Sequence, residues 1–263
     1  MALTKRQRAR MIRTSVYALT VAVLVAVALF VDWGKLGHAM FQWRLVRAQF
    51  PGILTTAARN TLIFTIFGFA GGLMIGLLMA LMRLSSVKPY RWFAATYIEV
   101  FRGIPLVVTL LILGFGLPIA FQWRWPNPYL QGCVPLALVA GAYMAETIRA
   151  GIEAVPKGQM EAARSLGMSY PRSMGSIIIP QALRIIVPPL TNELVLLIKD
   201  TSLISVLGVT ERTIDLARFG REGVNSTANA TPLIVAGLVY LVMTLPLTQL
   251  VALMERRTKA ASR

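Results

Sequence analysis

The chain has 263 residues, of which 56% are hydrophobic and only 14% are charged, and its mean hydropathy is +0.64. This composition is too apolar for a soluble domain of that length and places the chain in a lipid bilayer. The formal net charge of +16 would suit a nucleic-acid-binding protein, but the basic residues flank apolar runs instead of clustering in one polar domain. Nucleic acid is therefore not an expected partner, and an all-α protein with several membrane spans is.

The first predicted span is the uncharged run 14–31, which follows a basic N-terminal tail. With eighteen residues it is longer than the core of a secretory signal, and no convincing cleavage site of small residues follows it. We therefore expect an uncleaved membrane helix, with a signal peptide as the alternative. Residues 33–52 mix tryptophans with basic residues, which is typical of a segment at the membrane interface. Residues 1–50 are thus expected to contain the tail, this helix and an external interfacial segment.

The second predicted span, residues 60–82, carries Gly68, Gly72 and Gly76 on one stripe of the helix. Glycines four residues apart let a second helix approach the backbone closely. We interpret the stripe as a packing surface within the subunit. A short turn at residues 85–90 follows the span.

The region after this turn is predicted to contain a break. Residues 90–102 are only half apolar and precede Gly103 and Pro105, so we expect an oblique or interfacial helix that ends before a third span. The third span should end near residue 121, where a polar turn rich in aromatic residues begins. The fourth should cover about 134–148.

Residues 153–180 form the one sizeable polar stretch between strongly apolar segments, so they should lie in water beside the membrane. Pro156 suits the first turn of a helix, and Gly167 suits a left-handed residue that ends one. Together they predict an amphipathic helix of about eleven residues. Ser169 is expected to cap a second short helix that continues toward Pro180.

The first helix of this stretch is predicted to have two distinct faces. Met160, Ala163 and Leu166 recur at helical spacing and form an apolar strip. Glu161 and Ser165, four residues apart, share a neighbouring face. The helix can therefore rest on an apolar surface while it presents polar groups to water.

The fifth predicted span contains residues that are costly in lipid, namely Arg184, Pro188, Pro189, Glu193, Lys199 and Asp200. A span with so many charges and helix breakers should be kinked and buried within the protein. Residues 207–230 are polar and predict an external helix and loop. Residues 232–254 form the sixth predicted span, and a basic cytoplasmic tail closes the chain at 255–263.

The distribution of basic residues predicts the orientation of the chain. With the N-terminus inside, 17 Lys and Arg residues lie on the cytoplasmic side and 7 on the other, and three are unassigned. By the positive-inside rule, both termini and the 153–180 loop are then cytoplasmic.

Motifs for catalysis are absent from the sequence. The only Gly-Lys pair, Gly34 and Lys35, lacks the rest of a phosphate-binding loop, so the chain is not expected to hydrolyse ATP by that route. The single histidine, His38, excludes a histidine-based zinc site or catalytic dyad, and the single Cys133 excludes a disulfide within the chain and a cysteine-based metal site. We therefore predict a protein that is not an enzyme and that holds neither a metal nor a cofactor.

Two pairs of ionisable residues near membrane level are candidates for function. Glu99 with Arg102, and Glu146 with Arg149, are each three residues apart and can form an ion pair on one helix face. The predicted topology places both pairs toward the cytoplasmic ends of their spans. Two interpretations are equally open: the pairs neutralise themselves at the interface, or they line the inner end of a pathway and exchange partners when it opens.

The fifth span offers a second group of candidates, Glu193, Lys199 and Asp200. Charged residues this deep in a membrane are costly, which makes contact with a zwitterionic substrate a hypothesis for them. Structural pairing explains them equally well.

The 153–180 loop resembles the cytoplasmic EAA loop of ABC importer permeases. The pattern of that family is Glu-Ala-Ala, three residues, Gly, nine residues and Ile-x-Leu-Pro, and this sequence departs from it only by an isoleucine in place of the leucine. The matching residues are Glu161, Ala162, Ala163, Gly167, Ile177, Ile178, Ile179 and Pro180. The flanking stretches 143–159 and 197–211 narrow the resemblance to permeases for polar amino acids. Matching motifs are spread over residues 57–254, whereas residues 1–50 carry no family mark.

The resemblance implies a type I importer permease in the bacterial inner membrane, with about six transmembrane helices and a permease core at residues 51–254. Glu161, Ala162, Ala163, Gly167 and Pro180 would belong to the loop that couples to a separate ATPase. The expected partners are a second permease subunit, identical or different, two cytoplasmic ATP-binding subunits, an extracytoplasmic solute-binding protein and an amino-acid substrate.

Two other classes of function are weighed against this one. An ion-coupled secondary transporter usually places its site between internal repeats, and only a short echo between residues 99–103 and 146–151 is present. A structural scaffold would not need charges within the fifth span.

The identity of the substrate is only weakly indicated. Basic residues on the predicted outer side favour glutamate, glutamine or a related polar amino acid by long-range attraction, but they would equally dock an acidic face of the binding protein. These residues are Lys35, Arg44, Arg47 and Arg124.

Overall fold

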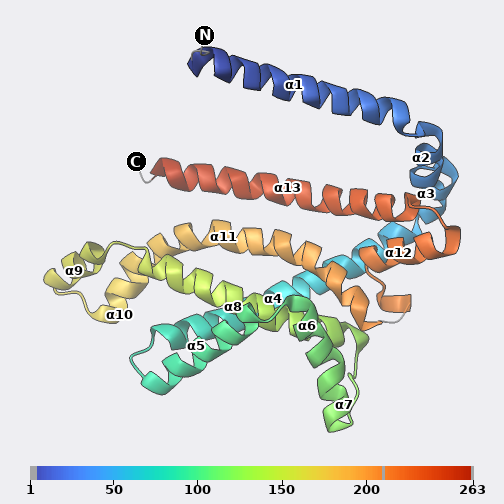
Figure 1. Ribbon diagram of the computed structural model, residues 1–263. Coiled ribbons are helices and arrows are strands. Elements are labelled where there is room, and N and C mark those ends of the chain that lie inside the picture. Colours follow the sequence, from blue (N-terminus) through green and yellow to red (C-terminus); the bar gives the residue numbers. More distant parts are fainter. Residues whose placement is uncertain (1–4, 209–210, 262–263) are drawn as a thin grey trace.

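The computed structural model describes residues 5–208 and 211–261, and every regular element in these two ranges is a helix, as the composition predicted (Figure 1). The long helices are α1 (Lys5–Phe30), α4 (Arg59–Leu84), α5 (Lys88–Gly103), α8 (Pro128–Glu153), α11 (Ile179–Asp200), α12 (Leu216–Thr227) and α13 (Thr231–Ala261). The shorter ones are α2 (Trp33–Met40), α3 (Trp43–Gln49), α6 (Leu106–Leu111), α7 (Leu117–Phe121), α9 (Lys157–Ser165) and α10 (Tyr170–Ser173). Three π-helical segments, η1 (Ile53–Ala58), η2 (Ile112–Gly116) and η3 (Met174–Ile178), and two 3₁₀-helical segments, η4 (Thr201–Leu207) and η5 (Glu211–Thr213), lie between them.

In the described part of the chain, five helical segments are each long and apolar enough to cross a membrane. They are Lys5–Phe30, Ile53–Leu84, Pro128–Glu153, Tyr170–Leu207 and Thr231–Arg256. These segments contain, or nearly contain, the first, second, fourth, fifth and sixth predicted spans. The predicted external helix at residues 207–230 is α12.

The predicted third span differs from the others. α5 and the segment Leu106–Phe121 reach the length and hydropathy of a span only together, and their directions differ by 106°. The break lies between Gly103 and Leu106, as the sequence predicted. Leu106–Phe121 by itself is shorter than the predicted third span, because its sixteen residues rise only about 24 Å as a helix and the apolar part of a bilayer is roughly 30 Å thick. Counted together with α5 as one bent span, it brings the number of spans to six, as the sequence predicted.

α4 packs closely against α8, and the glycine stripe of α4 forms the contact surface. Gly68, Gly72 and Gly76 are all buried there. A Cβ atom at Gly76 would come within 2.8 Å of the Met144 Cβ atom and 3.1 Å of the Ala145 backbone nitrogen, both on α8. The interpretation of the stripe as packing within the subunit is therefore confirmed.

α11 packs on α4, α8 and α13 and remains helical through Pro188 and Pro189. Lys199 on this helix is exposed, whereas Glu193 and Asp200 are half-buried. The prediction that the fifth span is enclosed by protein was therefore wrong within the single chain, because its neighbours cover only part of its circumference.

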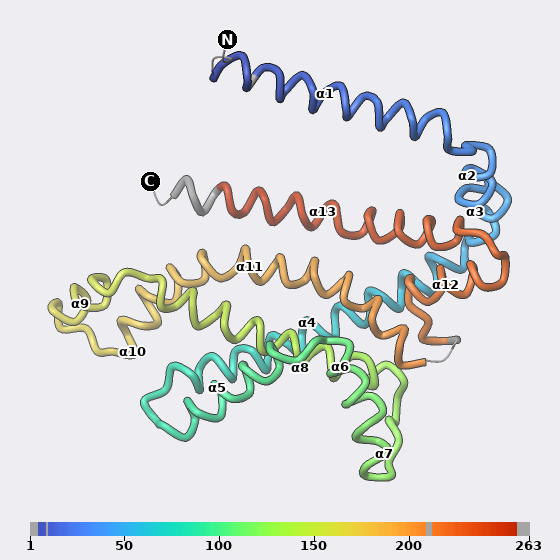
Figure 2. The backbone as a smooth tube through the Cα atoms, viewed as in Figure 1, coloured from blue at the N-terminus to red at the C-terminus, as the bar shows by residue number. Residues whose placement is uncertain are grey.

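The bundle of long helices has two distinct ends (Figures 1 and 2). The start of α1, the end of α13 and the α9–α10 segment lie at one end of the long helices, and α2, α3 and α12 lie at the other. α1 stands apart from the bundle, since none of the residues in its apolar window is buried. The α2–α3 segment that follows α1 is bonded to the bundle: the backbone N–H of Ala230 donates to the Ala39 carbonyl at 2.9 Å, and that of Gln42 donates to the Thr231 hydroxyl at 2.9 Å.

Candidate functional site

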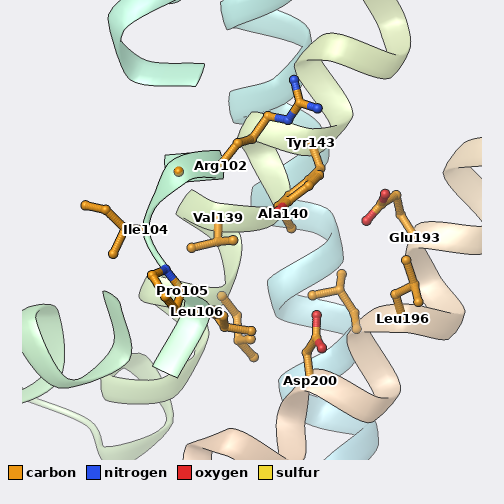
Figure 3. Close-up of a pocket in the computed structure, with 13 residues that line it drawn as sticks. Arg102, Ile104, Pro105, Leu106, Val139, Ala140, Tyr143, Glu193, Leu196 and Asp200 are labelled. Atoms are coloured by element: carbon orange, nitrogen blue, oxygen red, sulfur yellow. The ribbon is translucent and has the colours of Figure 1, made fainter. Parts of the chain in front are cut away.

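A cavity of about 570 Å³ opens at the break between α5 and α6, and α8 and α11 complete its walls (Figure 3). Three separate stretches of the chain therefore build it. Its lining residues are Arg102, Gly103, Ile104, Pro105, Leu106, Leu136, Val139, Ala140, Tyr143, Glu193, Leu196, Leu197 and Asp200. The walls are mainly apolar, with a few ionisable groups, which is the usual composition of a site for a small molecule.

Two carboxylates extend from α11 into this cavity. Glu193 points toward Tyr143 and Ala140 on α8, and Asp200 points into the cavity from the next turns of the same helix (Figure 3). The two are seven positions apart, so they lie on one face of α11 roughly 10 Å apart along its axis. Both carboxylates are half-buried, and the negative charge of Asp200 repels that of Glu193. A cation bound between them would relieve that repulsion.

Arg102 lies at the rim of the cavity and does not form the predicted pair with Glu99. Its guanidinium carbon lies 5.4 Å from the centre of the Tyr143 ring, a cation–π distance. Glu99 is exposed, and the described residues include no ion pair between it and Arg102. The pairing prediction was wrong because the helix ends at Gly103, directly after Arg102, and the guanidinium turns to α8 instead.

The second predicted pair is present and has a third member. The Arg149 guanidinium donates to both carboxylate oxygens of Glu146, with Nε–Oε2 at 3.0 Å and Nη2–Oε1 at 2.5 Å, and also pairs with Glu153. The charges of Arg102 and Arg83 act on Glu146 as well. The triad therefore lies between the cavity rim and the end of α8 that leads to α9, and its role in an inner gate stays a prediction.

The α9 helix ends as the sequence predicted. Gly167 has a left-handed backbone with φ of +80°. Its N–H donates to the Arg164 carbonyl at 3.0 Å, and the N–H of Met168 donates to the Ala163 carbonyl at 3.1 Å. This pair of bonds is a Schellman motif, which satisfies the last carbonyls of the helix and favours glycine at the left-handed position.

The start of α9 differs from the prediction. Pro156 precedes the helix as its N-cap instead of lying in the first turn, so α9 has nine residues and not eleven. Ser169 does occupy the N-cap position of α10, but its side chain makes no capping hydrogen bond. The hydroxyl of Ser173 donates to the Ser169 carbonyl at 3.0 Å instead.

The surface of α9 divides into a buried side and a free side. Met160 and Ala163 face the protein, where Met160 packs on the buried cluster around Ile178. Glu161 and Ala162 are exposed, and Leu166 is 84% exposed although the sequence assigned it to the apolar strip. α9 is thus anchored to the start of α11 and presents a carboxylate beside an uncovered apolar side chain.

The predicted site residues therefore fall into three groups. Arg102, Glu193 and Asp200 share the cavity, Glu146 and Arg149 form the triad with Glu153, and the EAA-loop residues lie together at one end of the chain, with Pro180 in the first turn of α11. Glu99 and Lys199 join none of these groups.

Sequence reasoning missed Tyr143 and Glu153. A signal existed for Glu153, because it follows Arg149 by four residues on a helix. None existed for Tyr143, whose partner Arg102 lies 41 positions earlier. The described residues contain no cluster of His, Cys, Asp or Glu suited to a metal ion.

The sequence matches known families over most of its length. Residues 72–260 match the family described as "Binding-protein-dependent transport system inner membrane component". The chain is similar to the arginine transport system permease protein ArtQ of Bacillus subtilis, with 39% identity over 81% of this chain and 94% of the relative. It is also similar to the glutamine transport system permease protein GlnP of Escherichia coli, with 37% identity over 83% of this chain and 98% of the relative.

A solved structure shares the fold as well as the sequence similarity. It is described as an amino acid ABC transporter with histidines, and it matches with a TM-score of 0.75 and 37% identity over 83% of this chain and 99% of its own. Sequence and fold thus agree along the same stretch of helices. This chain belongs to the family of inner-membrane components of binding-protein-dependent transport systems.

Proposed function

We propose that this chain is the permease subunit of an ATP-driven importer of amino acids, in which the cavity receives the substrate and α9 receives the movement of a separate ATPase. The family match and the relatives named as arginine and glutamine permeases support this function. The neighbouring structure described with histidines supports an amino acid as the transported class.

One structural observation supports the proposal most strongly: a single helix joins the two candidate sites. α11 begins at Ile179, is joined to the α9–α10 segment through η3, and ends at Asp200 in the cavity. Its 22 residues rise roughly 33 Å, and a helix of that length transmits movement along its axis. Gln181 at its start also donates to Gln159 of α9 at 3.4 Å. A force applied to α9 would therefore reach Glu193 and Asp200.

Among polar amino acids, the cavity fits those with a cationic side chain. Two carboxylates face the interior, and Arg102 at the rim is placed to pair with the α-carboxylate of a substrate. The apolar wall from Leu136 to Ala140 would cover the aliphatic part. An anionic side chain would instead meet two like charges in a partly dry space, where repulsion is stronger than in water. The outer basic residues would then serve the binding protein, the second of the two interpretations that the sequence left open.

The proposed assembly contains a second permease subunit, two ATPase subunits on the cytoplasmic side and an extracytoplasmic binding protein. Both termini and α9 would face the cytoplasm. The 17-to-7 distribution of basic residues supports this orientation, as does the location of α9 at the same end as the start of α1 and the end of α13. The ion-coupled alternative would need neither an exposed α9 nor an ATPase, and copurification of an ATPase distinguishes the two classes.

The test is equilibrium binding of labelled arginine, histidine, glutamine and glutamate to the purified complex of permease and ATPase without the binding protein. We expect arginine or histidine to bind best and glutamate not to bind. Glu193→Gln with Asp200→Asn should reduce binding of the cationic amino acid at least roughly tenfold, since charge-assisted hydrogen bonds contribute about 1.5–3 kcal/mol each. Asn192→Ala is the control on the same helix, because Asn192 is exposed and does not line the cavity.

Preferential binding of glutamate would contradict the proposed side-chain class. Equal loss in the double variant and the control would contradict the assignment of the cavity as the substrate site.

A further inference from the structure

A buried group of polar residues lies where α12 meets the outer ends of the membrane helices, far from α9. Asp215, just before α12, has 0% exposure. One carboxylate oxygen, Oδ2, accepts from the backbone N–H of Ala217 at 2.9 Å and caps α12. The other oxygen, Oδ1, is buried without a hydrogen-bond partner among the described residues, and so is the hydroxyl of Tyr240 on α13.

The Tyr240 hydroxyl lies close to the Asp215 carboxyl and to two buried hydroxyl groups. The charge of Asp215 acts on Tyr240, and Thr61 of α4 and Thr201 of η4 face the same tyrosine hydroxyl. The Thr61 oxygen accepts from the N–H of Leu216 at 3.1 Å, which ties the first residue of α12 to α4. α4, η4, α12 and α13 therefore meet at one buried polar group that contains Asp215 and Tyr240. A buried polar atom without a partner destabilises a fold, so the neutral form of the carboxyl, with its added O–H donor, suits this environment better than the ionised form.

The charged and titratable groups around Asp215 leave a close balance between its two forms. Arg221, on α12 itself, attracts the carboxylate, as do the N–H groups at the start of that helix. Tyr240 is the titratable neighbour on α13, and the Thr61 and Thr201 hydroxyls of α4 and η4 face the hydroxyl of that tyrosine. Against these attractions, burial raises the pKa of Asp215 to about 6. Its protonation thus changes across an accessible pH range.

We infer that Asp215 is a buried proton-binding site that fastens α12 to α4, η4 and α13, so that the outer end of this chain is held more tightly in acid than at neutral pH. The proton would sit on Oδ1 and be donated to an oxygen of the Tyr240–Thr61–Thr201 group. Above the pKa the carboxylate keeps its capping bond to Ala217, but its other oxygen is then buried as part of a charged group without a hydrogen-bond partner. α12 would then open more often.

The sign of the effect follows from linkage. The folded state holds the proton more tightly than an opened α12, in which the carboxyl has its ordinary pKa of 3.8. The added stability is therefore present in acid and is lost as the pH rises through about 6. Those two values predict that protection of the α12 amides is about tenfold greater at pH 5 than at pH 7.5.

The test is hydrogen exchange of the α12 amides in the full-length protein in lipid nanodiscs, corrected for the intrinsic effect of pH on exchange. Asp215→Asn and Asp215→Ser are the variants, since both side chains cap a helix and neither titrates near neutral pH. Wild type should gain roughly tenfold protection between pH 7.5 and 5, and either variant should show no such gain. Arg218→Gln removes a side-chain charge that pairs with Glu222 but keeps the backbone N–H that faces Asp215, so it should keep the wild-type response.

Two results would overturn the inference: wild-type protection of α12 that does not change between the two pH values, or the wild-type change retained in a variant at position 215. The wild-type measurement decides the question alone if both variants fail to insert. Exchange is measured without substrate, ATPase or ATP, so the outcome does not depend on the proposed transport function.

Discussion

The α9–α10 loop and the cavity are assembled in opposite ways. The loop is a contiguous stretch whose helix end is determined by residues next to one another, with Gly167 left-handed and Met168 bonded back to Ala163. The cavity takes residues from three stretches between positions 102 and 200. Its charged residues Arg102, Glu193 and Asp200 are each more than one helical turn apart in the sequence. If the loop contacts an ATPase and the cavity binds the substrate, as proposed, mutations should therefore be able to disturb one contact without the other.

Glu161→Lys is expected to give the largest difference between the effect on ATPase binding and the effect on substrate binding. The exposed carboxylate is proposed to accept charge-assisted hydrogen bonds from the ATPase, and reversal of its charge should cost about 2 kcal/mol, or roughly thirtyfold in affinity. Titration of the ATPase onto the purified permease measures this loss. Binding of the amino acid to the cavity should not change, and Glu161→Gln should lie between wild type and the lysine variant.

The comparison fails if Glu161→Lys weakens substrate binding as much as it weakens ATPase binding. Unchanged affinity for the ATPase would remove α9 as the coupling element.

A smaller effect is expected from Gly167→Val. A β-branched residue at φ of +80° strains the chain by about 1–2 kcal/mol, so the end of α9 should change shape while the membrane helices remain inserted. ATP-driven uptake into proteoliposomes should fall about tenfold relative to hydrolysis. Gly158→Ala is the matched control, because Gly158 lies at the other end of α9, does not have a positive φ, and has open space around its Cα atom.

Uptake and hydrolysis that stay coupled in Gly167→Val would show that the Schellman end of α9 has no part in coupling. A loss of the same size in Gly158→Ala would assign the effect to the helix in general.

The smallest effect is expected at the triad, which lies between the two regions. The Glu146 and Arg149 side chains are 31% and 25% exposed, so their pair should contribute only about 1 kcal/mol, or roughly fivefold in a rate. Glu146→Gln alone should raise basal ATP hydrolysis of the complex or impair uptake more than Glu146→Gln with Arg149→Gln, because the single change leaves an arginine without its main partner. Identical behaviour of the single and double variants would rule out a coupled gate.

The sequence alone predicted most of the membrane helices and the polar loop at residues 153–180. Long apolar runs can satisfy their backbone polar groups in lipid only as helices, so composition and length were sufficient for those spans. The break at Gly103 and Pro105 and the end of α9 at Gly167 were predictable because these residue types act on their own backbone. The EAA pattern likewise needed only residues at fixed spacing.

Only the tertiary structure decided which charged residues meet. Glu99 and Arg102 have the same spacing as Glu146 and Arg149, yet only the second pair forms, because Arg102 lies at a helix end and turns toward Tyr143. Likewise, Glu193 and Asp200 face the cavity while Lys199 between them does not. The packing of α11 against α8 and the bend after α5 determine these directions. A local pattern specifies which side chains share a helix face, whereas the neighbouring helices determine what that face contacts.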